Sequence, residues 1–295
     1  MKYLLLSLIT MLTVTACDII EPPYKKKIEV TPRDTSDTLS PLRNVLLEKF
    51  TGSVCTPCPP ANDVAKEIHE IYPLVSIISY HAGKLAQPEP SQGYVYDFIT
   101  NTGIELGVAF FKAPAPENII TPMGVIDRIG FDTLSKVRVG HKIWLTEIPK
   151  RFPIPSPVAI RIYPWYDPST RTLTVSGQVH FLENGFKDYN VTLALVEDSI
   201  IKPQKQPDGS KIVDYLHKNV FRSNIPNNAW GTPVSTTDQP KGSQVTFTRN
   251  LQFAPDSDWV PKNLKVVGYV YRNFNTPTVS REVLQSTSKK VSIVP

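Results

Sequence analysis

The chain has 295 residues, a length that allows two domains of ordinary size, each with its own hydrophobic core. Its formal net charge of +5 is small and dispersed, and no basic stripe is interleaved with aromatic residues, which excludes a nucleic-acid partner. The 28 prolines against 14 glycines favour extended connections and turns at the edges of β-sheets.

The first residues have the pattern of an export signal. Lys2 precedes an apolar run over residues 3–14, which is too short to span a bilayer permanently as a helix. Small residues then lead directly to Cys17. This pattern resembles the lipobox of bacterial lipoproteins, and the resemblance implies a signal peptide over residues 1–16 and lipidation of Cys17. The alternative is an ordinary secretory signal with a cysteine that falls there by chance.

A lipidated cysteine would make the membrane a partner of this protein, because each buried CH₂ contributes about 0.8 kcal/mol. Residues 17–40 lack apolar periodicity, contain several prolines and predict a tether. Within it, Lys25–Lys27 is typical of a solvated spacer. If Cys17 is the anchor, only Cys55 and Cys58 remain, and an exported CxxC pair persists as a disulfide unless something reduces it.

Residues 44–81 predict a βαβ unit. Apolar residues 45–50 indicate a buried strand, a turn leads to the CxxC pair, and helical apolar spacing begins at Ala61. Two consecutive prolines fit only a first helical turn, so we expect this helix to begin nearer Pro59 than Cys55. A β-branched run that ends in His81 predicts a second strand, parallel to the first.

The next residues complete the first predicted domain, 41–150. A polar, proline-punctuated insertion contains one expected helix over residues 94–101. Thr121–Pro122 heads a predicted strand, and we expect its peptide bond to be cis. A hairpin strand through Gly130 and a helix over residues 134–150 follow.

This order of elements resembles the thioredoxin superfamily, in which a CxxC pair at a helix start faces a cis-proline. The resemblance implies an α/β thioredoxin-like fold, with Cys55 as the attacking thiolate and Cys58 as the resolving cysteine. Thr121 would offer its backbone to a peptide beside Pro122. His81 would shuttle a proton; its alternative is a histidine with local hydrogen bonds only.

Two features depart from the thioredoxin pattern. Thioredoxins carry a buried carboxylate six residues before the first cysteine and a tryptophan directly before it, where this chain has Lys49 and Val54. Glu48 is one residue away and, by strand alternation, should face the opposite side of the sheet. A disulfide that only braces the turn therefore stays as open as active exchange.

A proline-rich break over residues 149–157 precedes a second predicted domain, 157–295. Strands are expected at residues 158–163, 171–181, 189–197, 244–253, 264–273 and 289–294. The number of short strands suggests an all-β immunoglobulin-like sandwich. Its aromatic residues are candidates either for a binding patch or, more commonly, for the core: Tyr163, Trp165, Tyr166 and Trp230.

No cofactor and no metal are expected. The remaining histidines lie in separate segments without carboxylates at ligand spacing: His69, His141, His180 and His217. The sequence contains no HExxH, P-loop, GxSxG or dinucleotide-binding pattern.

Several motifs occur together along the mature chain: a lipobox, a proline-rich tether, VLLEKFTG before the CxxC pair, TPMGVIDR, and the stretch over residues 215–222. Together they resemble the Omp28-related outer-membrane lipoproteins of Gram-negative bacteria. The resemblance implies a lipid-anchored protein in the cell envelope, at the outer membrane, facing the periplasm or the cell surface.

Two functions stay open for such a protein. The first is a binding or adhesion lipoprotein that holds an exported protein or an extracellular ligand on a thioredoxin-like scaffold. The second is a membrane-anchored enzyme that performs thiol–disulfide exchange with Cys55 and Cys58.

Overall fold

The computed structural model of the chain describes residues 41–131, 137–274 and 280–294. The predicted signal peptide, the tether and Cys17 lie outside these residues, as does the first part of the helix expected over residues 134–150.

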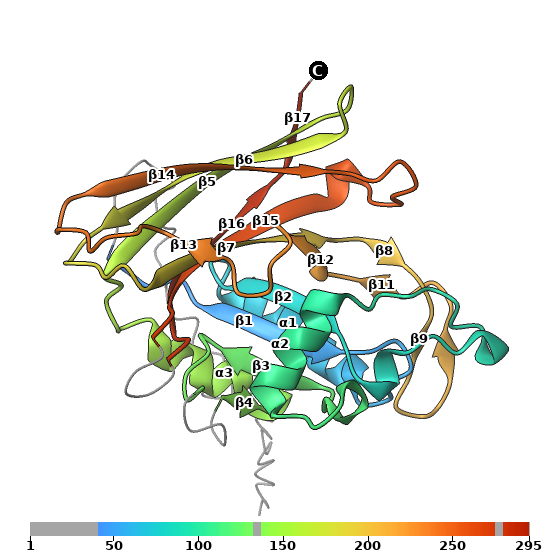
Figure 1. Ribbon diagram of the computed structural model, residues 1–295. Helices are drawn as coiled ribbons and strands as arrows, with labels where there is room; N and C mark the ends of the chain where they lie inside the picture. Colours follow the sequence, from blue (N-terminus) through green and yellow to red (C-terminus); the bar gives the residue numbers. More distant parts are fainter. Residues whose placement is uncertain (1–40, 132–136, 275–279, 295) are drawn as a thin grey trace, which may run out of the picture. The chain divides into compact units, whose positions relative to one another are not determined.

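A nine-stranded sheet runs through the described residues, in the order β16-β15-β7-β12-β2-β1-β3-β4, with β13 paired to β7 (Figure 1). Its strands are β1 (Leu46–Thr51), β2 (Ser76–His81), β3 (Met123–Ile126), β4 (Arg138–Val139), β7 (Tyr189–Glu197), β12 (Val220–Asn224), β13 (Thr232–Pro233), β15 (Leu264–Arg272) and β16 (Val283–Lys290). As predicted, β1 and β2 pair in parallel, whereas β3 is antiparallel to β1. The sheet joins both predicted domains, because Val220 of β12 pairs with Ser79 of β2.

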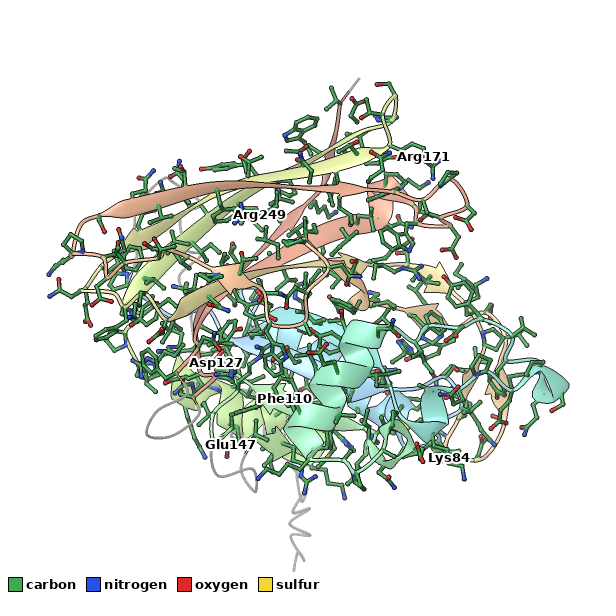
Figure 2. The ribbon with its side chains drawn as sticks, viewed as in Figure 1. Lys84, Phe110, Asp127, Glu147, Arg171 and Arg249 are labelled. Carbon is green, nitrogen blue, oxygen red and sulfur yellow. A yellow bond between two sulfur atoms is a disulfide. The ribbon has the colours of Figure 1, made fainter. Side chains whose placement is uncertain are left out.

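Two helices cover opposite faces of β1 and β2. Helix α1 (Cys58–Ile71) buries Ala61, Ala65 and Ile68, which recur at helical spacing and pack with residues of β1 and β2. Helix α2 (Asn101–Phe111) lies on the other face, where Phe110 packs edge-on against Phe50 of β1 (Figure 2 labels Phe110). The start of α1 at Cys58 confirms the prediction that this helix begins nearer Pro59 than Cys55.

A second sheet lies over β15 and β16, with strand order β14-β6-β5-β17 (Figure 1). Its strands are β5 (Val158–Asp167), β6 (Thr172–Phe181), β14 (Gln244–Gln252) and β17 (Ser292–Ile293). One face of β5 and β6 packs with β7, β15 and β16 in a single apolar cluster, so the two sheets form a β-sandwich, as the strand pattern predicts. The strand expected over residues 289–294 is the end of β16 followed by β17.

The prediction of a helix over residues 94–101 is wrong. Tyr94 to Thr100 is irregular, with Phe98 stacked on His81, and the helix begins only after Thr100, whose Oγ1 accepts a hydrogen bond from the Gly103 N–H at 3.1 Å. The true helix α2 contains Gly103 and Gly107, which weaken its helical signal in the sequence.

The long helix expected over residues 134–150 is also wrong. The chain instead forms the short strand β4, which pairs with β3, and then three short helical pieces: η5 (His141–Ile143), α3 (Trp144–Glu147) and η6 (Ile148–Arg151). Gly140 is extended and separates β4 from η5. Pro149 lies in η6, where its ring has no N–H to continue the helical hydrogen bonds. Gly130, expected within a hairpin strand, lies in a turn with φ of 72°.

Residues 198–219, here named the cover segment, leave the sheet between β7 and β12. The segment forms two short antiparallel pairs, β8 with β11 and β9 with β10, which were not predicted. Their bounds are β8 (Ile200–Ile201), β9 (Gln204–Lys205), β10 (Lys211–Ile212) and β11 (Leu216–His217). Four further 3₁₀ turns complete the described elements: η2 (Lys84–Ala86), η3 (Pro90–Gln92), η4 (Pro116–Asn118) and η7 (Pro261–Asn263).

Buried polar groups tie the beginning of the described chain to its end. The Arg43 guanidinium donates to the Val283 carbonyl at 2.7 Å and lies 3.8 Å from Asp127, a buried carboxylate that also pairs with Arg151 at 3.0 Å (Figure 2 labels Asp127). The Asn44 N–H donates to Gln285 Oε1 at 2.6 Å. The entry to β1 is thereby held against β16.

Candidate functional site

The CxxC pair lies at the end of β1. Cys55 and Cys58 form a disulfide, and both side chains are 0% exposed. Cys58 is the first residue of α1, whereas Cys55 belongs to the preceding turn. The helix has Pro57 at its N-cap, with no side-chain capping hydrogen bond.

Two segments from elsewhere in the chain enclose this turn. Gln204 of the cover segment donates through Nε2 to the carbonyls of Gly52 at 3.2 Å and Cys55 at 3.3 Å. The Lys205 N–H donates to the Ser53 carbonyl at 2.9 Å. On another side, a Cβ at Gly52 would lie 2.2 Å from the Leu85 carbonyl oxygen, so only glycine allows this close approach. The turn is therefore enclosed by backbone and by an amide side chain.

The other predicted site residues lie at the same end of the sheet. Pro122 directly precedes β3, whose Met123 pairs with Phe50, and the Thr121–Pro122 peptide bond is cis, as expected. His81 is the last residue of β2 and pairs with Thr51, the last residue of β1. Thr121 is partly buried, and its Oγ1 has no hydrogen-bond partner among the described residues.

His81 lies in an aromatic environment. Its ring stacks on Phe98 at a centroid distance of 4.3 Å and lies 5.7 Å from the ring of His217. Burial, followed by the nearby charges of His217, Lys49 and Arg222, lowers the pKa of His81 well below its ordinary value. Nδ1 of His81 is buried without a hydrogen-bond partner in the described part of the chain.

His217 was expected only as one of the histidines outside any metal set, and its proximity to His81 was not predicted. The residue is only 4% exposed, and its Nε2 lies 3.1 Å from the Lys202 carbonyl oxygen. Burial lowers its pKa to about 4. No local signal relates the two histidines, because one ends β2 and the other lies in β11.

Lys49 occupies the β1 position at which thioredoxins carry a carboxylate. It is 5% exposed, and its ammonium group donates a hydrogen bond to Asn62 Oδ1 of α1. Asn62 in turn donates to the Tyr215 hydroxyl at 2.8 Å. Burial lowers the pKa of Lys49 to about 8.

Glu48 faces the other side of the sheet, as strand alternation predicts. It forms a two-pronged ion pair with Arg128, with both nitrogen–oxygen distances at 2.7 Å, and both side chains are fully buried. Arg128 also lies over the rings of Phe110 and Tyr269. The pair is separated from the disulfide turn by the sheet itself and belongs to the core.

Lys49, His81 and His217 line one cleft of about 550 Å³. Its walls come from β1, α1, β2, the cover segment and the approach to β15. The volume lies in the range of pockets that hold small molecules. This cleft and the adjoining disulfide turn form the candidate site.

The aromatic residues considered for a binding patch do not form one. Tyr163 and Trp165 are exposed by 52% and 39% on the outer face of β5, whereas Tyr166 is buried in the sandwich. Trp230 packs near Phe110, with a ring-centroid distance of 6.3 Å.

Two further properties concern only the part of the chain that the structure describes. Among residues 41–131, 137–274 and 280–294, no group of three or more histidine, cysteine or acidic side chains is arranged to hold a metal ion. Within the same ranges, no helix has the length and apolar character needed to cross a membrane.

The fold and site thus define a protein in which an α/β half with a buried CxxC disulfide shares its sheet with a β-sandwich. The chain belongs to the family described as outer membrane protein Omp28, whose model matches residues 119–293, more than half of the sequence. This confirms the resemblance inferred from the motifs and places the protein in the cell envelope, at the outer membrane.

Solved structures similar to this chain include two from Porphyromonas gingivalis. HBP35 of Porphyromonas gingivalis shares its fold with a TM-score of 0.62, at 14% identity, over 86% of this chain and 77% of that one. A domain of the outer membrane lipoprotein Omp28 from Porphyromonas gingivalis is 19% identical over 48% of this chain and 92% of that domain, with a TM-score of 0.31. No curated protein matches the sequence.

Proposed function

We propose that this protein is a binding lipoprotein, anchored to the outer membrane through Cys17, whose thioredoxin-like half is a scaffold. Membership of an outer-membrane family supports the location. The parallel β1–α1–β2 unit with a CxxC pair at the start of α1 supports a thioredoxin-like assignment of residues 41–150. The sandwich that follows is assigned as immunoglobulin-like on its strand pattern. The partner is an exported protein or an extracellular ligand.

The enclosure of the disulfide carries this proposal. Exchange requires a thiolate of one molecule to reach a sulfur of another, so reactive cysteines are partly exposed. Here both cysteines are 0% exposed, and Gln204 bonds across the turn that carries Cys55. The usual buried carboxylate is replaced by Lys49. We therefore assign the disulfide a bracing role, in which it holds the turn at the entry to α1.

The test is the reduction of insulin by dithiothreitol, followed by turbidity, with the mature protein added. We expect the same rate as without protein, and the same rate again with the Cys55→Ala/Cys58→Ala variant. A rate that rises with the native protein and not with the double variant would contradict a bracing role.

Thiol–disulfide exchange is a second candidate, favoured by one observation. The carboxyl ends of β1 and β2 lie beside the start of β3, and this brings the CxxC turn, His81 and Pro122 to one end of the sheet. In that function, Cys58→Ser leaves Cys55 in mixed disulfides with envelope proteins, visible on non-reducing gels. The matched control is Cys55→Ser/Cys58→Ser. Absence of adducts in the single variant removes this candidate.

A further inference from the structure

The cleft beside β1 and α1 carries an excess of positive charge. Six lysines line it: Lys49, Lys66, Lys218, Lys262, Lys265 and Lys290. Three carboxylates line it: Asp63, Glu70 and Asp198. Lys265 pairs with Asp198 at 2.9 Å, and Lys66 lies 3.8 Å from Glu70. Within the described residues, four of these lysines and one of these carboxylates therefore have no ion pair.

Lys49 is the buried member of this set. Its hydrogen-bond partner among the described residues is the neutral amide of Asn62. No carboxylate of the described residues lies within ion-pair distance of its ammonium group. A buried ammonium group without an opposite charge costs free energy, and chains normally provide a counter-ion. Since the pKa of Lys49 is about 8, the group is still mostly charged at pH 7. The cleft therefore holds a cation that the residues described by the structure leave uncompensated.

His81 adds an unsatisfied polar group to the same cleft. It is 4% exposed, and its Nδ1 has no hydrogen-bond partner in the described ranges. Buried polar atoms in folded proteins nearly always have a partner, so an unpartnered nitrogen on a residue that lines a cleft is a position that a water, an ion or a ligand can satisfy. A neutral imidazole offers one N–H group, which an anionic oxygen can accept.

We propose that this cleft binds a polar small molecule through an anionic group, phosphate or carboxylate, which lies against the Lys49 ammonium group and accepts a hydrogen bond from His81. The proposal rests on the binding function and names the class of its ligand. Lys218, on the cover segment, adds positive charge at the wall, and the Tyr215 hydroxyl and Asn62 amide hold Lys49 in place. A volume of about 550 Å³ leaves room for a ligand body beyond the anion itself.

The test uses the mature protein and two probes, inorganic phosphate and acetate, each titrated in a thermal-shift assay against potassium chloride at matched ionic strength. A bound ligand stabilises the native state by an amount that saturates with concentration. We expect a saturable rise in melting temperature with at least one probe and none with chloride. Saturation with phosphate alone or acetate alone decides which anionic group the cleft accepts.

Three variants locate the binding. Lys49→Met keeps most of the length of the side chain without its charge and should weaken binding at least tenfold. Lys218→Glu, at an exposed cleft wall, should weaken binding without entering the core. Lys241→Met, on an exposed loop outside the cleft, is the control and should bind as the native protein does. A saturable shift that persists in both cleft variants overturns the proposal, as does the absence of any saturable shift.

This outcome is separate from that of the proposed function. Mixed disulfides at Cys55 in the Cys58→Ser variant would refute the bracing role whatever the anion titration shows. A protein that forms no adducts and binds neither probe retains its scaffold role and loses the anion site.

Discussion

At the scale of single residues, Lys49 is the clearest departure from the thioredoxin pattern at this site. A carboxylate at this position would accept protons from a buried cysteine, whereas an ammonium group cannot. That a lysine replaces this carboxylate could be predicted from the sequence, because the position lies six residues before Cys55. The burial of its ammonium group without a counter-ion could not be predicted, since it depends on Asn62, Tyr215 and the cover segment.

Replacing Lys49 should stabilise the protein in the absence of ligand. Lys49→Met removes a buried charge at the cost of one hydrogen bond, so we expect the free energy of unfolding to rise by about 1–2 kcal/mol at pH 7. The folded pKa of about 8 is below the unfolded value of 10.5, so the unfolded state binds more protons between these values and native stability rises with pH there.

Urea denaturation at pH 7 and pH 10 measures both effects. The gain from Lys49→Met should shrink at the higher pH, where the native lysine is neutral. Equal differences at the two pH values would show that the ammonium group is not the source of the instability.

At the scale of elements, local pattern predicted α1 and most of the longer strands but not β12 or most of β16, and non-local packing explains the failures. Gly107 weakens the helical signal of α2 because it serves packing: a Cβ at this position would lie 2.7 Å from Ile119 Cδ1 and 3.2 Å from Phe50. The cover segment offers no strand pattern, because its short pairs depend on contacts with the disulfide turn. Gln204 therefore could not be found as a site residue.

Gly107→Ala should destabilise the protein although alanine favours helices. The propensity gain is about 1 kcal/mol, whereas overpacking a tight site costs about 1–3 kcal/mol. We expect a lower melting temperature for Gly107→Ala. Gly103→Ala is the comparison: its Cβ would lie 3.0 Å from Thr100 Oγ1 and 3.5 Å from Tyr80, a less severe overlap, so it should lower the melting temperature less. Equal melting temperatures for the two variants would contradict the packing explanation of α2.

Gln204→Ala should expose the disulfide. The substitution removes the hydrogen bonds to the Gly52 and Cys55 carbonyls, each contributing about 1 kcal/mol, so the cover segment should open more often. We expect dithiothreitol to release thiols several-fold faster under native conditions. Gln206→Ala, which loses one hydrogen bond within the cover segment, serves as the control. An unchanged release rate in Gln204→Ala would mean that the cover does not limit access.

At the scale of the whole molecule, the order of an α/β part and a β-sandwich could be predicted from periodicity. It could not be predicted that strands of both parts pair in one sheet, because pairing between distant segments leaves no local pattern in the sequence. The apolar cluster around Phe50 and Leu106 also includes Val196, Phe221 and Tyr269 from the second half. The proposed boundary near residues 149–157 therefore divides the sequence but not the core.

A fragment of residues 41–156 should fail to fold by itself. It would leave one edge of β2 unpaired and expose the apolar surface that β7, β12 and β15 cover. We expect no cooperative thermal transition by circular dichroism and rapid proteolysis, in contrast to residues 41–295. A soluble fragment with a cooperative transition would establish an independent first domain.

The bonds from Arg43 and Asn44 to β16 imply a particular order of events when the protein is made. Contacts between residues that are far apart along the chain slow folding, because a long loop must close before they form. The bonds that hold the entry to β1 cannot form until β16, nearly the last strand, has left the ribosome. The complete sheet should therefore form only once synthesis is nearly finished, which leaves time for a chain that is still incompletely folded to enter a secretion channel.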